Sequence, residues 1–412
     1  MLTKAINKVI EEREKYILSL IVVLLPFSMF YTNVFIFLFG FSWLIRLLKN
    51  EVAINLPGLS IMSASIYLAC LIISLLYTQS DHLVFAWRKI ESKLSLFVLI
   101  LPIIWSSKKI QVKDIEFIFT MFSLTVLTTC ILCYSQAVFK SGVLYDYFDL
   151  NFRGAYYLNP TKLDTGYFAL YVALTIAFIA NKYFINKQNK NAPFQTILVG
   201  LALLFLLFNL FLSNAKIGVI IGLVNVTLSV FYYPFKHPSS KLAFSTIFLV
   251  TIGSLFIASL FFTRNLYNEF ILEAAGDGGY LNTRLTIWES AFKLFLKSPF
   301  FGYGIGDVKT LLASEYLKIG FERGHLMLYN SHNQMIEMAL EVGLVGVLCY
   351  LSVLIFPLIR SFNNESNHRY FITCLYLNFV IFGTIEVFLA RHEGIIVFSI
   401  FFSLLYILNK RN

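Results

Sequence analysis

The chain has 412 residues, of which 58% are hydrophobic and 14% charged, and its formal net charge is +10. Soluble domains are about a quarter charged. Together with a mean hydropathy of +0.74, the composition therefore excludes an ordinary soluble protein and predicts an all-α integral membrane protein. In such a chain the excess of Lys and Arg is expected to orient the loops, so we expect no nucleic-acid partner.

The cysteines and histidines indicate no metal and no cofactor. Cys130 and Cys133 have the spacing of a redox or metal pair, but they lie in an apolar segment without a second pair or a nearby histidine. The other three cysteines are also in apolar segments, and the six histidines show no metal-ligand spacing. We interpret the cysteines as membrane-buried thiols.

The apolar runs predict about 12 transmembrane helices, because a helix needs about twenty apolar residues to cross a bilayer. Residues 1–15 are charged and no small-residue cleavage site follows the first run, so we expect a signal anchor that is retained. Tyr31-Thr32-Asn33 is expected to join the first two spans. The spans are predicted near residues 16–30, 34–48, 57–77, 94–105, 115–139, 165–180, 196–212, 217–233, 242–262, 333–359, 370–389 and 394–408.

The distribution of basic residues predicts the orientation. With the N-terminus in the cytoplasm, 18 of the 33 Lys and Arg residues lie on inner segments and eight on short outer loops. The remaining seven lie in the long segment 263–331 between spans 9 and 10, where the positive-inside rule does not apply. This bias predicts cytoplasmic termini and places the long segment outside.

The outer segment is expected to be helical. Residues 282–297 have polar and apolar residues at helical period and predict an amphipathic helix that rests on the bundle or the bilayer surface, ended by Ser298-Pro299. Asp307 is expected to cap a second helix that reaches about Ile319, with Gly320 as its stop. We interpret residues 1–412 as a single membrane domain into which residues 263–331 are inserted.

A candidate catalytic base follows this segment. Ser331 is a favoured N-cap, and a histidine in the first helical turn would stay neutral beside the positive end of the helix dipole, which predicts that His332 can accept a proton. Glu337 and Glu341 would share one face of the same helix, and Gly343 and Gly346 would admit a neighbouring helix. From spacing alone, a solvated histidine with structural glutamates is an equal alternative.

Several cations on the outer side indicate a polyanionic ligand such as a diphosphate. We interpret four lysines instead as interfacial residues whose ammonium groups reach the water: Lys89, Lys140, Lys293 and Lys297. The outer cations that are candidates for the ligand are Arg88, Lys93, Arg153, Lys162, Lys216, Arg264, Arg284 and Arg391.

Three motifs resemble the O-antigen ligase and polymerase superfamily of bacterial membrane glycosyltransferases, and the similarity extends over essentially the whole chain. They are Arg284-x-x-x-Trp288, Ser298-Pro299-x-x-Gly302-x-Gly304, and His332-Asn333 with Glu341-x-Gly343-x-x-Gly346.

The resemblance implies a GT-C-type fold and a glycan donor linked to undecaprenyl diphosphate. It implies that Arg284 binds the donor diphosphate and that His332 activates the acceptor hydroxyl. Lys216 stands where the family has a second arginine, so the charge is kept but the bidentate geometry is lost. As supporting residues we consider Lys93, Arg88, Asn333, Glu341, Glu386 and Arg391.

The ligase branch predicts a metal-independent, inverting transfer of polysaccharide to a lipid A-core acceptor, in lipopolysaccharide biosynthesis. The site would face the periplasm from the bacterial inner membrane, and membrane lipids would surround the chain. A polymerase that extends a glycan acceptor and a protein-directed oligosaccharyltransferase would use the same donor. A lipid-linked glycan flippase is an alternative from another class, although the unusual residues gather on one outer face rather than at the midplane typical of transporters.

Overall fold

The computed structural model describes residues 13–51, 58–106, 110–141, 163–185, 193–213, 215–236, 245–253, 255–256, 259, 280–363 and 368–411. Within these ranges every regular element is a helix and no strand occurs. The predicted all-α class is therefore confirmed for the described part of the chain. The predicted N-terminal anchor lies partly outside these ranges, because residues 1–12 are not among them.

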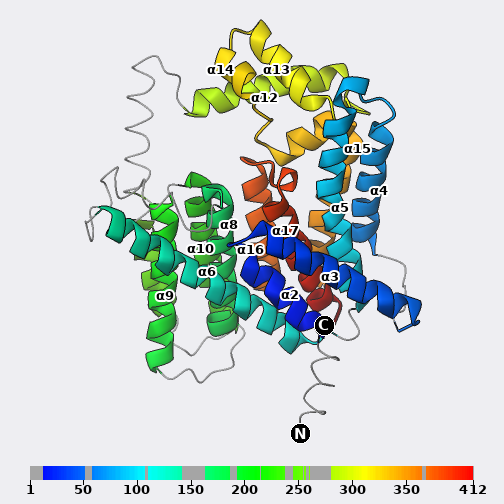
Figure 1. Cartoon of the computed structure of the whole chain (residues 1–412). Coiled ribbons are helices and arrows are strands. Elements are labelled where there is room, and N and C mark those ends of the chain that lie inside the picture. Colours follow the sequence, from blue (N-terminus) through cyan, green and yellow to red (C-terminus); the bar gives the residue numbers. More distant parts are fainter. Residues whose placement is uncertain are drawn as a thin grey trace.

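Most of the long helices run side by side as a bundle (Figure 1). They are α4 (Leu59–Ser74), α5 (Leu83–Trp105), α8 (Thr165–Ala180), α9 (Pro193–Leu212), α10 (Lys216–Lys236), α15 (Gln334–Asn363), α16 (Arg369–Gly383) and α17 (His392–Arg411). Three further helices run obliquely across the bundle in Figure 1: α2 (Arg13–Leu24), α3 (Met29–Leu48) and α6 (Val112–Ser141). Among the contacts that hold the bundle, α4 packs against α15 and α5 against α17.

Six of the described helices are long and apolar enough to cross a membrane. They lie in Met29–Leu48, Val112–Lys140, Thr165–Tyr183, Phe194–Leu212, Gln334–Phe362 and His392–Asn409. Three shorter apolar helices lie in Met62–Ser74, Lys216–Tyr232 and Arg369–Gly383. The chain is thus a multi-pass membrane protein, and the count of 12 spans stays a prediction. The predicted ninth span, residues 242–262, is helical over 245–253 and lies partly outside the described residues.

Two predicted boundaries are wrong. Residues 31–33, expected to join the first two spans, lie inside α3, which begins at Met29 with Ser28 as its N-cap. The chain breaks earlier, around Pro26, whose ring nitrogen has no N–H to donate. The fourth span, expected to begin near residue 94, belongs to a helix that begins at Leu83, so the basic residues Arg88, Lys89 and Lys93 lie inside α5.

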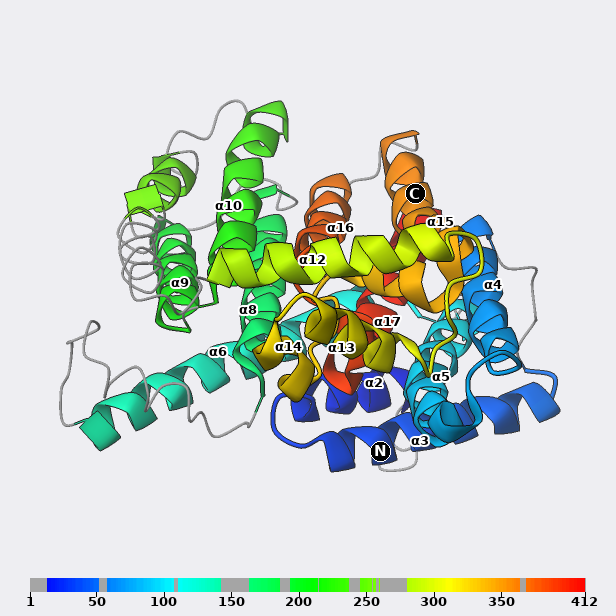
Figure 2. The same cartoon turned by 90° about the horizontal axis from the view of Figure 1, so that it is seen from above.

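Residues 280–331, the described part of the segment predicted to lie outside, form a layer across one end of the bundle, which we call the outer layer. Seen from above, α12 (Tyr280–Lys297) crosses that end from the side of α10 to α15 (Figure 2). The helices α13 (Val308–Lys318) and α14 (Glu322–Met327) lie beside it. The predicted amphipathic helix 282–297 is confirmed, since Ile287, Ala291 and Leu294 are buried in a small core with α13 and α15.

The turn after α12 joins this layer to α15. Inside α15, Val342 and Gly343 have non-helical backbone angles, so the regular hydrogen bonds of the helix are interrupted there. The N–H groups of Tyr303 and Gly304 donate to the carbonyls of Leu340 and Glu341 at 2.8 and 3.0 Å. In return, the N–H of Leu344 donates to the Pro299 carbonyl at 2.8 Å. The two glycine motifs of the sequence are therefore two sides of one backbone junction.

The same turn also contacts the region between α4 and α5. The N–H of Ile305 donates to Ser74 Oγ at 3.1 Å, and the Asp307 carboxylate contacts His82 Nδ1 at 2.6 Å and the N–H of Gln79 at 3.1 Å. Asp307 precedes α13 as predicted, but its side chain makes no capping hydrogen bond because these partners occupy it. Gly320, with φ +74°, ends α13 as predicted.

The glycine junction predicts that Gly343→Ala lowers the thermal unfolding temperature in detergent. Gly343 has φ +70° and ψ −159°, a combination that essentially only glycine adopts, so a residue with a Cβ would be strained by about 1–3 kcal/mol. The new Cβ would also overlap the Phe300 carbonyl, which adds about 1–3 kcal/mol of overpacking.

Gly320→Ala is the matched control, because φ is +74° there but no atom lies within 4 Å of an added Cβ. Equal losses of unfolding temperature in the two variants would contradict the importance of the junction.

Candidate functional site

The turn that carries His332 lies just before α15 rather than within it. Asn333 is the helix cap, since its Oδ1 accepts from the N–H groups of Met335 and Ile336 at 2.9 and 3.1 Å. The prediction that Ser331 caps the helix is wrong, and His332 is not in the first helical turn. The prediction that the helix dipole keeps His332 neutral therefore does not apply.

His332 has a left-handed backbone, with φ +45°, which is uncommon for a residue other than glycine. Its N–H donates to Asn330 Oδ1 at 3.0 Å, and its carbonyl accepts from Arg284 Nη1 at 3.1 Å. One residue earlier, the Ser331 carbonyl accepts from Trp288 Nε1 at 3.1 Å. Backbone strain of about 1–3 kcal/mol persists only where several contacts fix it, and such positions cluster at functional sites.

Arg284 and Trp288 are one helical turn apart on α12, so the Arg-x-x-x-Trp motif presents both side chains to the same turn. Arg284 Nη1 also donates to the Ile385 carbonyl at 2.6 Å, and the side chain is buried. The motif therefore connects α12 to both the His332 turn and the segment after α16.

Glu386 completes this group. Its Oε2 lies 3.8 Å from His332 Nδ1, and the two side chains are 28% and 26% exposed, so ligands can reach both. Burial raises the pKa of Glu386, but the neighbouring His332 and Arg284 side chains and the Val387 N–H outweigh it and lower the pKa below the ordinary value. Glu386 is therefore a carboxylate at neutral pH.

A second group of charges lies buried beneath the turn. Lys93 Nζ is 2.7 Å from Glu341 Oε2, and Tyr67 donates its hydroxyl to the same carboxylate at 3.2 Å. Lys89 Nζ is 3.3 Å from Glu341 and 3.5 Å from Glu337. Two lysines four residues apart on α5 thus face two glutamates four residues apart on α15. The prediction that Glu337 and Glu341 share one face of the helix is confirmed.

Glu337 connects the buried charges to the His332 turn. Its Oε2 accepts from Ser331 Oγ at 2.8 Å and from the Ser331 N–H at 3.3 Å. The interpretation of Lys89 as an interfacial residue is wrong, because its side chain is only 18% exposed and paired with both carboxylates. The signal for this pairing in the sequence was the four-residue separation of Lys89 from Lys93, which matches that of Glu337 from Glu341.

The remaining sequence-predicted residues lie in different places. Asn333 has a structural role, since its Nδ2 also donates to the Thr384 carbonyl at 3.2 Å. Lys216 is the first residue of α10, and Arg88 is exposed on α5. Arg391 precedes α17, with Nη1 3.6 Å from Asp164 Oδ2 and the guanidinium 5.8 Å from the centre of the Tyr167 ring. Three further candidate cations fall outside the described residues: Arg153, Lys162 and Arg264.

The buried charges predict that Lys93→Met lowers stability strongly. Removing one partner of a buried ion pair costs about 3–5 kcal/mol, and Lys89 remains near Glu341, so the lower end is expected. Thermal unfolding of purified protein in detergent would measure the loss.

Lys293→Met provides the control. Its pair with Glu289 is equally short at 2.7 Å but 49% and 68% exposed, so the cost should not exceed about 1 kcal/mol. A loss in Lys93→Met as small as this would contradict the structural importance of the buried group.

Comparison with known proteins identifies a similar family and several relatives. The O-antigen ligase family model matches residues 201–351, a range that includes Lys216, Arg284, His332 and Glu341. An uncharacterized Haemophilus influenzae protein is 23% identical over 322 residues, covering 74% of this chain and 76% of that protein.

Two Rickettsia relatives are named "Putative polysaccharide ligase". The R. prowazekii protein is 27% identical over 232 residues, covering 54% of this chain and 53% of the relative. The R. conorii protein is 26% identical over 107 residues, covering 25% and 26%. The matched part thus spans about half or less of these two relatives. These matches confirm the resemblance that the motifs indicated: residues 201–351 are similar to the O-antigen ligase family.

Proposed function

We propose that the chain is a membrane glycosyltransferase of the O-antigen ligase type. It would move a polysaccharide from undecaprenyl diphosphate to a lipid A-core acceptor at the periplasmic face of the inner membrane, within a GT-C-type fold. The observation that carries the proposal is the group formed by Arg284, His332 and Glu386, in which a partly exposed imidazole in a strained turn lies beside a carboxylate. The match of residues 201–351 to the ligase family supports it.

In the proposed reaction the acceptor hydroxyl oxygen attacks C1 of the first sugar of the donor. His332 takes the hydroxyl proton, the bond between C1 and the phosphate oxygen breaks, and undecaprenyl diphosphate leaves with the electron pair. Attack from the face opposite the leaving group inverts the anomeric centre. The Glu386 carboxylate beside Nδ1 stabilises the imidazolium that forms.

Positive charge near the leaving group is the second requirement. Arg284 and Lys216 would stabilise the charge that develops on the diphosphate, in the role that a metal ion has in many soluble glycosyltransferases. Arg284 would also couple donor binding to the base, since its Nη1 holds the His332 carbonyl. For Lys93 the geometry supports a positioning role rather than donor contact, because it is buried against Glu341.

The proposal predicts that His332→Ala lowers glycan transfer by about a hundred- to ten-thousand-fold, the usual contribution of a general base. Product on the acceptor would be measured in cells and related to the amount of protein in the membrane fraction.

His325→Ala is the control in the same outer segment, where Nδ1 of His325 lies 2.9 Å from the Ala313 carbonyl within α13. Near-normal product with His332→Ala, or an equal loss in both variants, would remove His332 from the mechanism.

Ligase and polymerase share the proposed donor chemistry, so the acceptor decides between them. Deleting the gene in its host should leave long glycan on the lipid carrier and bare core at the surface. Core with a single repeat, and only single repeats on the carrier, would instead assign the chain as a polymerase. Carrier-linked glycan that stays on the cytoplasmic side of the membrane in the deletion would instead indicate a flippase, because a ligase acts after the glycan has crossed the membrane.

A further inference from the structure

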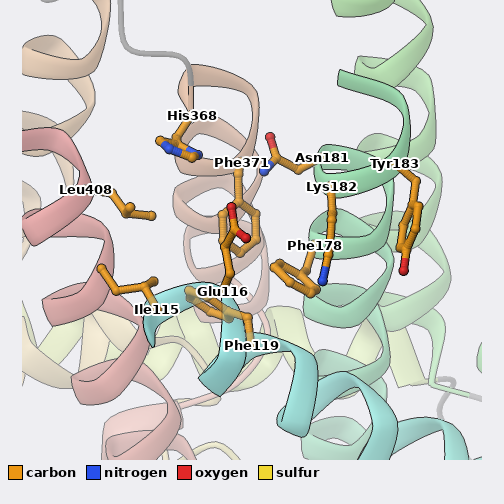
Figure 3. Close-up of a pocket in the computed structure, with 10 residues that line it drawn as sticks. All are labelled: Ile115, Glu116, Phe119, Phe178, Asn181, Lys182, Tyr183, His368, Phe371 and Leu408. Atoms are coloured by element: carbon orange, nitrogen blue, oxygen red, sulfur yellow. The ribbon is translucent and has the colours of Figure 1, made fainter. Parts of the chain in front are cut away.

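A cavity of about 350 Å³ lies between the ends of four helices of the bundle (Figure 3). Its lining residues come from the start of α6, the end of α8, the start of α16 and the end of α17. Because α15 runs from the His332 turn to Asn363, a lining residue such as His368 lies a full helix length from the candidate catalytic group. The cavity is therefore separate from that site.

The inner part of the cavity is aromatic. Phe119 lies at its base, with ring centres 5.4 Å from Phe178 and 4.9 Å from Phe371. The apolar side chains of Ile115 and Leu408 continue this surface. Such a wall accepts hydrocarbon, and its Phe178 ring also lies within cation–π distance of Lys182, with 5.6 Å between the ring centre and Nζ.

Charged and polar groups line the rest of the cavity. Figure 3 shows the Glu116 carboxylate pointing into the space, with His368 and Asn181 above it. Lys182 Nζ donates to Thr120 Oγ1 at 3.0 Å, which uses one of its three donors. A cation and a carboxylate thus face the same space.

Asn181 is 4% exposed, and its Oδ1 is buried without a hydrogen-bond partner among the described residues. Because this oxygen is itself covered by protein atoms, a ligand in the cavity would meet the remainder of the Asn181 side chain. Asn181 begins a π-helical turn, Asn181–Ile185, a local widening that is common at functional sites.

We propose that this cavity binds the headgroup of a phospholipid with a primary amine, a phosphoethanolamine. Its phosphate would contact Lys182 and His368, and its ammonium would donate to the Glu116 carboxylate. An anionic headgroup without an amine would bring its phosphate near that carboxylate with no N–H groups to pair with it. A choline headgroup has no N–H to donate to Glu116. The volume admits a headgroup, and the aromatic wall receives the start of an acyl chain.

The test uses the full chain, purified in detergent and depleted of lipid, with native mass spectrometry during titration. Phosphatidylethanolamine should bind at least about tenfold more tightly than phosphatidylglycerol or phosphatidylcholine. Glu116→Gln should abolish this preference, and because Glu116 is exposed the variant should fold. Lys182→Met should weaken all three phospholipids by about tenfold.

Glu91→Gln, an exposed carboxylate on α5 away from the cavity, is the matched control and should bind as the parent does. Equal binding of the three lipids, or an unchanged preference in Glu116→Gln, would overturn the proposal. Soluble glycerophosphoethanolamine bound as tightly as the lipid would also overturn it, since the ligand would then be a free phosphoamine.

Discussion

The interruption of α15 at Val342–Gly343 is the constraint on which the outer end of the structure depends. A helix that breaks within an apolar environment leaves carbonyl and N–H groups that water cannot satisfy. Here the turn after α12 supplies the missing partners to Leu340, Glu341 and Leu344. The position of α12 relative to α15 is therefore fixed by backbone hydrogen bonds, and with it the meeting of Arg284 and Trp288 with the His332 turn.

The buried charges beneath the turn contribute more to the specificity of helix packing than to net stability. Two ammonium groups and two carboxylates leave water together, and the attraction between them roughly offsets the cost of desolvation. What the arrangement provides is a link between α5 and α15, because Lys89 and Lys93 both pair with Glu341 and Lys89 also pairs with Glu337. Ser331, next to His332 in the chain, is connected to these charges through its hydrogen bond to Glu337.

Hydropathy predicted most of the helices because each apolar run must form a helix to satisfy its backbone in a membrane. Hydropathy placed the start of α5 too late, because charged residues normally mark the end of an apolar run. Here Lys89 and Lys93 lie inside the helix, where ion pairs with Glu341 compensate their charges. The cap of α15 was misassigned because Ser331 and Asn333 are both favoured caps, and tertiary bonds decide between them: Trp288 holds the Ser331 carbonyl outside the helix. The group of Arg284, His332 and Glu386 came from family resemblance, since spacing does not reveal contacts between distant segments.

The first two turns of α15 have a consequence for how the molecule unfolds. Leu340 and Ile336 belong to the small core under α12 and α13, whereas Met338 and Val342 belong to the large core of the bundle. One short stretch of helix thus contributes to both cores from its opposite sides. Loss of either core would expose the other, so the outer layer and the bundle should melt in one cooperative step, and the outer layer should not persist as an independently folding unit.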